Sequence, residues 1–239
     1  MYFELTLNKF GILLILFYAN ISYLHSQDTT LTLKDIDGNI YKTIKIGDML
    51  WSTENLRVTH YQNGDSIPNV IEKYDWSELV TGAYCKYDNN DYDARKYGYL
   101  YNWYAINDIR NIAPVGWHVP TDEEFTRLYI ILGISKIEAD SINLYGEKIG
   151  GKLKESGTSH WESPNTGSTN ESGFSALPGG FRLYDGNFDG IECSSLFWTS
   201  SNYDTLTAWV IILVNINSSI HRGHGPMQNG LSIRLVRNN

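Results

Sequence analysis

The chain has 239 residues, of which 42% are hydrophobic; this fits one domain of about 200 residues or two small ones and excludes disorder for most of the length. Its 19 Lys and Arg stand against 27 Asp and Glu, and the net charge of -8 argues against nucleic acid and anionic membrane surfaces as partners. With 17 Tyr, 7 Trp, 8 Phe and 21 Gly, the composition favours a turn-rich, aromatic-cored β protein over a helical bundle.

The N-terminal segment carries an apolar run, FGILLILFY at residues 10–18, preceded by Lys9. The run is too short to span a bilayer but has the length of a signal-peptide core. We therefore predict a signal peptide at residues 1–26 and a mature chain at residues 27–239, with Ser22 as an alternative end of the leader. An uncleaved anchor or a buried strand is the less favoured interpretation. We expect a secreted or cell-surface protein with no membrane span after cleavage and no lipid anchor, because no Cys lies near the cleavage region.

Two runs of alternating apolar and polar residues, 31–36 and 39–46, flank Asp37 and Gly38 and predict a β-hairpin. The segment beginning at Asp35 superficially resembles a calcium loop, but position 12 of such a loop would be Ile46 rather than Glu. A strand is predicted at residues 49–51, and a turn at Asn63 and Gly64.

Three helical segments are predicted next. Leu100, Trp103 and Tyr104 have helical spacing within residues 97–107. Thr121 and Glu124 form a capping-box signature that opens a helix ending at Gly133, with its apolar face on Phe125, Leu128, Ile131 and Leu132. Residues 147–155 suggest a third, short helix interrupted by Gly150 and Gly151.

The C-terminal half begins with a polar surface loop at residues 157–173. β structure is predicted at residues 174–177, a tight hairpin turn at 184–188, and strands at 196–198, 208–214 and 231–236. The strand at 208–214 is apolar throughout and is expected to be central and covered on both faces. The mature chain is thus predicted to be one α+β domain.

The chain carries several ordered sequence blocks: DGNIY (37–41), IGDMLW (46–51), ENL (54–56), GAYC (82–85), GYLYNWYA (98–105), PVGWHVPTD (114–122), GGKLKE (150–155), NESGFSALPGG (170–180) and GLSIRLVR (230–237). Together they resemble one family, the Fibrobacter succinogenes major paralogous domain. The resemblance implies a C-type lectin-like fold, with twisted antiparallel sheets and hairpins, two short flanking helices and long loops. Formylglycine-generating oxidases and the variable receptor proteins of retroelements share that fold, and the strands between Trp198 and Val236 would form its central sheet.

The cysteine content limits the chemistry that the resemblance allows. Many members carry Cys where this chain has Ala113 and Leu235, and Cys85 and Cys193 can form one disulfide or remain two free thiols. An oxidase of the formylglycine type needs a Cys pair near the C-terminal core, where Cys193 stands alone. We therefore expect no enzyme of that type.

Other sites are disfavoured on their residues. The chain has neither a Gly-x-Ser-x-Gly motif nor a lectin-type calcium motif. Asp88, Asn90, Asp91 and Asp93 gather oxygen ligands for a hard cation, but a solvated loop is the favoured interpretation. His221 and His224 are assigned to a loop, because Gly223 and Gly225 break any helix that would let them chelate a metal. We predict no metal, no cofactor and no catalysis.

The tryptophans divide into two groups. Trp51, Trp103, Trp117, Trp198 and Trp209 lie in predicted elements or motif blocks and are assigned to the core. Trp76 and Trp161 lie in polar stretches and are the two we consider as ligand platforms, although partial burial under a loop is favoured even for them.

The remaining hypothesis is recognition by loops between the last strands, the region where the variable receptor relatives display binding side chains. A non-enzymatic module recognising a glycan or protein ligand is predicted to use Asn202, Tyr203, Asp204, Asn217, Ser219, His221 and Arg222. Two alternatives stay open: a structural cell-surface protein without a small-molecule ligand and, with less support, a divergent enzyme.

Overall fold

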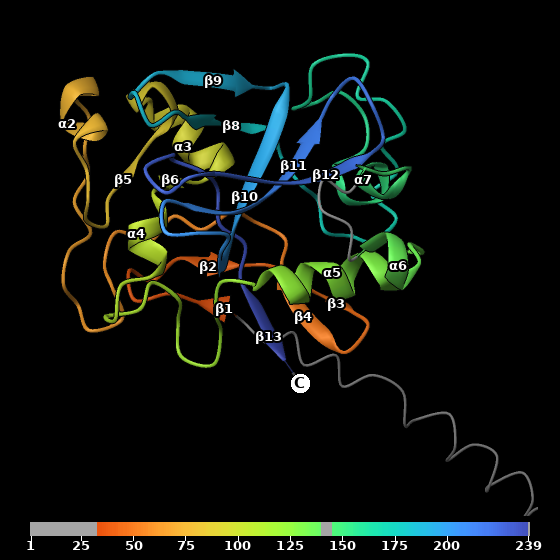
Figure 1. Cartoon of the computed structure of the whole chain (residues 1–239), viewed down its shortest axis with the longest axis horizontal. Coiled ribbons are helices and arrows are strands. Elements are labelled where there is room, and N and C mark those ends of the chain that lie inside the picture. The colour runs from red at the N-terminus through yellow and green to blue at the C-terminus, as the bar shows by residue number, and fades with distance from the viewer. Residues whose placement is uncertain (1–32, 140–144, 239) are drawn as a thin grey trace, which may run out of the picture. The chain divides into compact units, whose positions relative to one another are not determined.

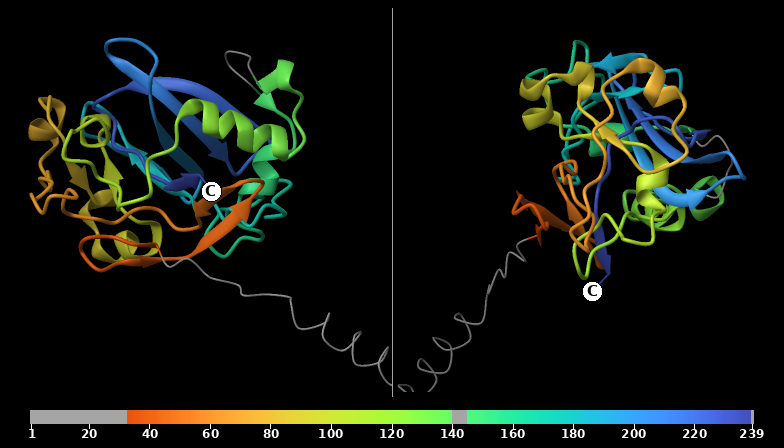
Figure 2. Two further views of the ribbon diagram at one scale, coloured as in Figure 1. Left: turned by 90° about the horizontal axis from the view of Figure 1, so that it is seen from below. Right: turned by 90° about the vertical axis from the view of Figure 1, so that its left-hand side faces the viewer.

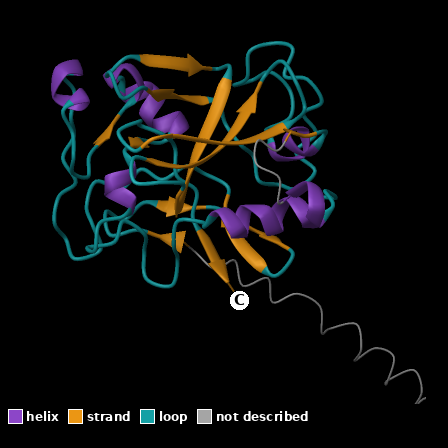
Figure 3. Ribbon diagram, viewed as in Figure 1, coloured by secondary structure: helices purple, strands orange, loops and turns teal. Residues whose placement is uncertain are grey.

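The computed structural model describes residues 33–139 and 145–238, all within the unit Thr32–Asn239. The predicted signal peptide lies outside the described residues. Within the described part, no helix combines the length and apolar character that crossing a membrane requires. Strands, a few short helices and long connecting loops make up this unit (Figure 3), so the predicted α+β class is confirmed.

Six strands form the largest sheet, in the order β7-β12-β11-β10-β8-β9 (Figure 1). All neighbours are antiparallel except β8 and β10. The consecutive strands β10, β11 and β12 form a meander, in which Trp209 lies opposite His224. The strands are β7 (Tyr145–Gly146), β8 (Gly179–Arg182), β9 (Phe188–Ile191), β10 (Ser194–Asn202), β11 (Thr207–Val214) and β12 (Ile220–Pro226).

Seven shorter strands form three small sheets. The first hairpin pairs β1 with β2, a three-stranded sheet has the order β13-β4-β3, and β5 pairs with β6. The run predicted as one hairpin arm, residues 39–46, is therefore divided between two sheets. These strands are β1 (Leu33–Lys34), β2 (Ile40–Tyr41), β3 (Thr43–Ile46), β4 (Met49–Ser52), β5 (Tyr84–Cys85), β6 (Leu100–Tyr101) and β13 (Val236–Asn238).

The longest described helix, α5, has the predicted capping box: the Thr121 hydroxyl accepts from the Glu124 N–H, and the Glu124 carboxylate accepts from the Thr121 N–H. Phe125 and Leu128 are buried as predicted, but Ile131 is 44% exposed and Tyr129 is buried instead. The described helices are α2 (Lys73–Ser77), α3 (Asp91–Tyr97), α4 (Trp103–Ile106), α5 (Asp122–Ile131), α6 (Lys136–Ala139) and α7 (Ile149–Leu153), with a 3-10 turn at Tyr87–Asn89.

The meander has a core on each face. Helix α5 runs across one face (Figure 2, left), where Phe125 and Leu128 share a buried cluster with Phe197, Ile211 and Leu213. On the other face Trp198, Ala208 and Val210 pack with Met227 and Leu231. The predicted central position of β11 is confirmed. Its predicted full coverage is wrong, because Thr207, Trp209, Ile212 and Val214 are only partly buried.

Several local predictions were wrong because pairing with distant segments determines the backbone conformation there. Leu100 lies in β6, paired with Cys85, so the helix predicted at residues 97–107 is reduced to α4. Residues 174–177 contribute one isolated bridge, at Ala176, rather than a strand. Conversely, the segment containing His221 and His224, predicted to be a loop, is strand β12, because six of its residues pair with β11.

The segment 231–236 is also not the predicted strand, since its backbone bonds go to several different segments. Leu231 donates to the carbonyl of Tyr101, Ser232 donates to that of Leu196, and the carbonyl of Ile233 accepts from Leu56. Only Val236 enters a strand, β13. Every residue from 231 to 236 is buried, so the apolar content of the segment reflects burial between sheets.

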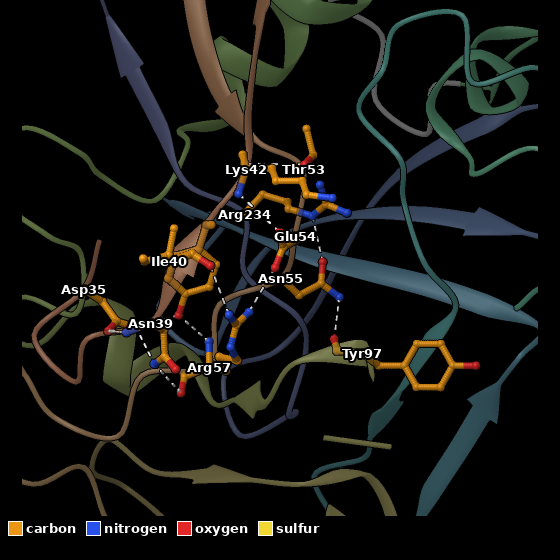
Figure 4. A network of polar contacts seen from close by, with 11 residues as sticks. Asp35, Asn39, Ile40, Lys42, Thr53, Glu54, Asn55, Arg57, Tyr97 and Arg234 are labelled. Carbon is orange, nitrogen blue, oxygen red and sulfur yellow. Dashed lines mark hydrogen bonds and ion pairs between the residues drawn. The ribbon is translucent and has the colours of Figure 1, made fainter. Parts of the chain in front are cut away.

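Three buried cations organise the long loops by donating to backbone carbonyls. Arg234 donates to the side-chain oxygen of Asn55 (2.7 Å) and to the carbonyls of Ser52, Phe174 and Ser175; Asn55 in turn donates to the carbonyl of Tyr97 (Figure 4). Burial lowers the pKa of Arg234 to about 9. Arg182 donates to the carbonyls of Val70, Ile71 and Gly186, and Lys154 to those of Thr166, Val214 and Asn217. These bonds satisfy loop carbonyls that would otherwise be buried without partners.

Candidate functional site

Five of the seven residues predicted to bind a ligand lie at opposite ends of the meander, and the other two, His221 and Arg222, lie within β12. Asn202 ends β10, and Tyr203 and Asp204 follow it in the β10–β11 turn, whereas Asn217 and Ser219 lie in the β11–β12 turn. Successive turns of an antiparallel meander lie at opposite ends of its strands, and the eight residues of β11 separate them by roughly 25 Å. The structure therefore does not bring the seven residues together in one group, because the residues of the two turns are separated.

The β11–β12 turn is bonded and packed against the framework. The ammonium of Lys154 donates to the carbonyl of Asn217 (2.8 Å), and the Asn217 side chain accepts from the Ser219 N–H (2.9 Å). A methyl group on Gly150 would lie 2.1 Å from the carbonyl oxygen of Ser219, so α7 touches this turn directly. Lys154 is fully buried and Gly150 lies within α7.

The β10–β11 turn is instead closed by its own residues. One carboxylate oxygen of Asp204 accepts from the N–H groups of Leu206 and Thr207, each at 2.8 Å, and these bonds lower the pKa of Asp204. The Tyr203 N–H donates to the carbonyl of Thr207 (2.9 Å). One bond comes from outside the turn, from the Met227 N–H to the Leu206 carbonyl (3.0 Å). The side chains of Tyr203 and Leu206 nevertheless remain 41% and 72% exposed.

Three aromatic rings meet beside this turn and form what we call the aromatic cluster: Tyr203, Trp209 and His224. The rings of Tyr203 and His224 are stacked, with centroids 4.0 Å apart and planes 10° from parallel. The Trp209 ring stands at 88° to that of Tyr203, with centroids 4.9 Å apart. His224 is exposed and Trp209 is partly exposed, so the cluster forms an aromatic corner on the surface.

An ion pair fixes the base of the aromatic cluster. Arg222 donates from Nε and Nη2 to the two carboxylate oxygens of Asp122, at 2.7 and 2.5 Å, and its guanidinium carbon lies 3.8 Å from the centroid of the Trp209 ring. The Asp122 N–H donates to the hydroxyl of Ser201 (3.1 Å). The start of α5, the end of β10 and β12 are thus linked beneath Trp209.

His221 lies on the other face of β12, because side chains one position from Arg222 point to the opposite side of the sheet. Its burial lowers its pKa. His221 and His224 are three positions apart in a strand and so cannot chelate one metal ion together. Across residues 33–139 and 145–238, no group of three or more His, Cys, Asp or Glu side chains is arranged to hold one.

The tryptophan assignment was right in favouring burial for Trp76 and Trp161 over a platform role, and it was wrong for Trp209. Trp76 and Trp161 are 0% and 1% exposed. Trp76 packs against the guanidinium of Arg182 (4.5 Å), and Trp161 donates to the carbonyl of Ala176 (3.0 Å). Trp209, assigned to the core, is instead part of the exposed cluster. Trp209 lies near the start of β11, next to the β10–β11 turn, and this position is the sequence signal that could have identified it as exposed.

Three histidines pair with carboxylates: His60 with Asp37 (2.5 Å), His118 with Glu124 (2.8 Å) and His160 with Glu155 (2.7 Å). In the first pair the hydroxyl of Thr59 contacts the same ring nitrogen, Nδ1, that contacts Asp37. A nucleophile–base–acid relay uses the two different ring nitrogens, so this trio lacks that geometry.

The two cysteines are free thiols, so the alternative without a disulfide holds. Burial raises the pKa of Cys85 to about 12. Cys193 donates to the carboxylate of Glu162 (2.8 Å), and this bond, with burial, raises its pKa to about 11. Neither thiol is activated as a nucleophile, because only the thiolate is reactive.

The acidic segment at residues 88–93 uses its side chains locally. The Asn90 side chain caps α3 by accepting from the Tyr92 N–H, and Asp91 pairs with Lys86. The predicted solvated loop was therefore wrong in part, because Asp88 lies in the 3-10 turn and Asp91 and Asp93 lie in the first turn of α3.

The model of the Fibrobacter succinogenes major domain matches residues 44–237, and the chain therefore belongs to this family. The match begins within β3, so the β1–β2 hairpin precedes it. No curated protein and no solved structure matches the chain. The C-type lectin-like architecture consequently stays a prediction.

Proposed function

We propose that this member of the Fibrobacter succinogenes major domain family is an exported, non-enzymatic binding module that recognises a glycan or protein ligand through the aromatic cluster. The observation that carries the proposal is the exposed corner formed by Tyr203, Trp209 and His224. Exposed aromatic surface is unfavourable in water unless a partner covers it, and grouped aromatic rings are typical of binding surfaces.

The chemistry of the cluster fits both ligand classes. Flat rings pack against the C–H faces of a sugar or against apolar side chains, and the neighbouring polar groups of Asn202 and Asp204 can hydrogen-bond at the edge. The negative charge of the chain disfavours polyanionic partners such as nucleic acid.

The cluster is also held in place before any ligand binds. The Arg222–Asp122 pair anchors Trp209 from below, and the Asp204 turn fixes the position of Tyr203. Preorganisation of this kind lowers the entropy that binding must offset.

The proposal also includes two further parts: the protein is exported, and it has no catalytic activity. The His–carboxylate pairs and both thiols have local structural contacts rather than the geometry of an active site. Export rests on the apolar run at residues 10–18 and on no structural observation.

The test is an array of plant and bacterial polysaccharides and cell-surface proteins probed with the purified protein in calcium-containing buffer. We expect at least one saturable ligand, whose affinity falls about tenfold or more in Tyr203→Ala. The matched control is Tyr184→Ala, which removes a tyrosine that is 56% exposed in a different turn.

Equal losses in Tyr203→Ala and Tyr184→Ala would place the binding surface elsewhere. A blank array from folded protein would favour a structural cell-surface role. Turnover of any array component would contradict the non-enzymatic part of the proposal.

A further inference from the structure

A separate cleft of about 420 Å³ lies between the β1–β2 turn, the turn before Trp117 and strand β13. Its volume is in the range of pockets that take small organic ligands. The side chains that the argument uses are Lys34, Asp35, Ile36, Val115, Trp117 and Arg237.

The apolar part of the cleft is built around Trp117. This side chain is 7% exposed, and its backbone N–H donates to the carbonyl of Pro114 (3.0 Å), which also lines the cleft. Ile36 and Val115, at 51% and 84% exposure, line the opening. The cleft thus offers an apolar surface against which a ring can pack.

The charged part of the cleft is positive. Among the described residues, no carboxylate forms an ion pair with Lys34 or Arg237. The one acid in the lining, Asp35, is 5% exposed, and its carboxylate accepts from Asn39 and from the hydroxyl of Tyr41. The two cations outnumber the one acid of the lining, so the cleft is positively charged in a chain of net charge -8.

We propose that this cleft binds a small organic anion: a carboxylate attached to a ring or a similarly compact apolar body. The carboxylate pairs with Lys34 and Arg237, while the ring packs against Trp117, Ile36 and Val115. Charge-assisted hydrogen bonds supply the specificity, and burial of the ring supplies the remaining affinity. The site does not depend on the aromatic cluster, which contributes no residue to the cleft.

The probe is 4-methylbenzoate, titrated into the 15N-labelled whole chain while the indole N–H signals are followed by NMR. The Trp117 signal is identified as the one missing in Trp117→Phe. We expect this signal to shift saturably with 4-methylbenzoate. The neutral isostere 4-methylbenzamide, tested on the unmodified protein, is expected to bind about tenfold more weakly or worse.

The variants separate a specific site from general attraction of anions. Lys34→Gln combined with Arg237→Gln is expected to weaken 4-methylbenzoate binding about tenfold or more. Arg95→Gln combined with Lys136→Gln removes the same charge from two exposed positions outside the cleft and is expected to leave the affinity within about twofold. The proposal is overturned by a Trp117 signal that does not move, by equal binding of acid and amide, or by equal losses in the two double variants.

Discussion

The two turns of the meander are built from similar polar residues but are held in opposite ways. The β11–β12 turn receives a hydrogen bond from the buried Lys154 and lies in direct contact with Gly150 of α7. The β10–β11 turn is closed mainly by Asp204, with one outside bond from the Met227 N–H to the Leu206 carbonyl, and it leaves the side chains of Tyr203 and Leu206 exposed. The first turn is thus part of the framework, whereas the second displays side chains.

This difference distinguishes a structural turn from a binding turn, which sequence composition alone does not distinguish. Asn, Ser and Asp are equally typical of binding loops and of loops whose polar groups bond internally. The partners of the backbone decide between the two roles: external bonds tie a turn to the core, and internal bonds leave its side chains available. Substitutions in the β11–β12 turn, which we call the framework turn, should therefore change stability. Substitutions in the β10–β11 turn, which we call the displaying turn, should change binding.

The largest expected effect on stability comes from Lys154→Met. The substitution leaves three carbonyls without their donor, although burial of the ammonium is itself unfavourable and lowers its pKa to about 8. We expect a net loss of about 2–4 kcal/mol in the free energy of unfolding, measured with urea. Lys152→Met, which removes a partly exposed lysine, is the control, expected to cost less than about 1 kcal/mol. Equal losses of stability in the two variants would show that Lys154 contributes no more to stability than Lys152.

Gly150→Ala should come next. The added methyl group meets the Ser219 backbone at 2.1 Å, and we expect the free energy of unfolding to fall by about 1–3 kcal/mol. Gly223→Ala in β12 is the control, since its methyl group would find its nearest neighbour at 3.8 Å. A smaller effect at Gly150 than at Gly223 would show that α7 does not support the β11–β12 turn.

Acid should loosen the helix that supports the displaying turn. Burial favours the neutral form of Glu124, but hydrogen bonds from His118, Thr121 and Asn238 outweigh it and lower the pKa from 4.5 to about 2. The stabilisation is therefore complete above about pH 5 and is lost as the pH falls toward 2, by about 1–2 kcal/mol at pH 3. Urea unfolding of the protein and of Glu124→Gln at about pH 5 and at about pH 3 checks this. The variant should lose less stability in acid, and an identical loss would contradict the assignment.

Tyr203→Ala should have the smallest effect on stability, below about 1 kcal/mol by urea unfolding, because Tyr203 is 41% exposed and its turn is closed by Asp204. A loss as large as that of Lys154→Met would make Tyr203 a framework residue and remove the distinction between the two turns.

Local features were predictable from the sequence, and features that depend on distant partners were not. The Thr121 capping box and the turn at Asp37 and Gly38 are specified within a few residues, and both were correct. Strand β12 was missed because Gly, His and Pro have low strand propensity and its pairing with β11 overrides that preference. The contact of Trp76 with Arg182, a residue 106 positions later in the sequence, left no local signal, although burial of Trp76 was favoured.

The candidate site was half predictable for the same reason. Tyr203, Asp204 and Arg222 were identified from their position between the last strands. Trp209 and His224 were missed as its members, because an apolar strand suggested full burial and a glycine-rich segment suggested a loop. Only the register that pairs Trp209 with His224 brings these rings together with Tyr203.

The most direct test compares ligand binding at the two turns. For the tightest array ligand, dissociation constants are measured for Tyr203→Ala with His224→Ala and for Asn217→Ala with Ser219→Ala. The account predicts a loss of about tenfold or more for the first pair and a change below about twofold for the second. A larger loss in the second pair would contradict the account, because it would place recognition at the framework turn.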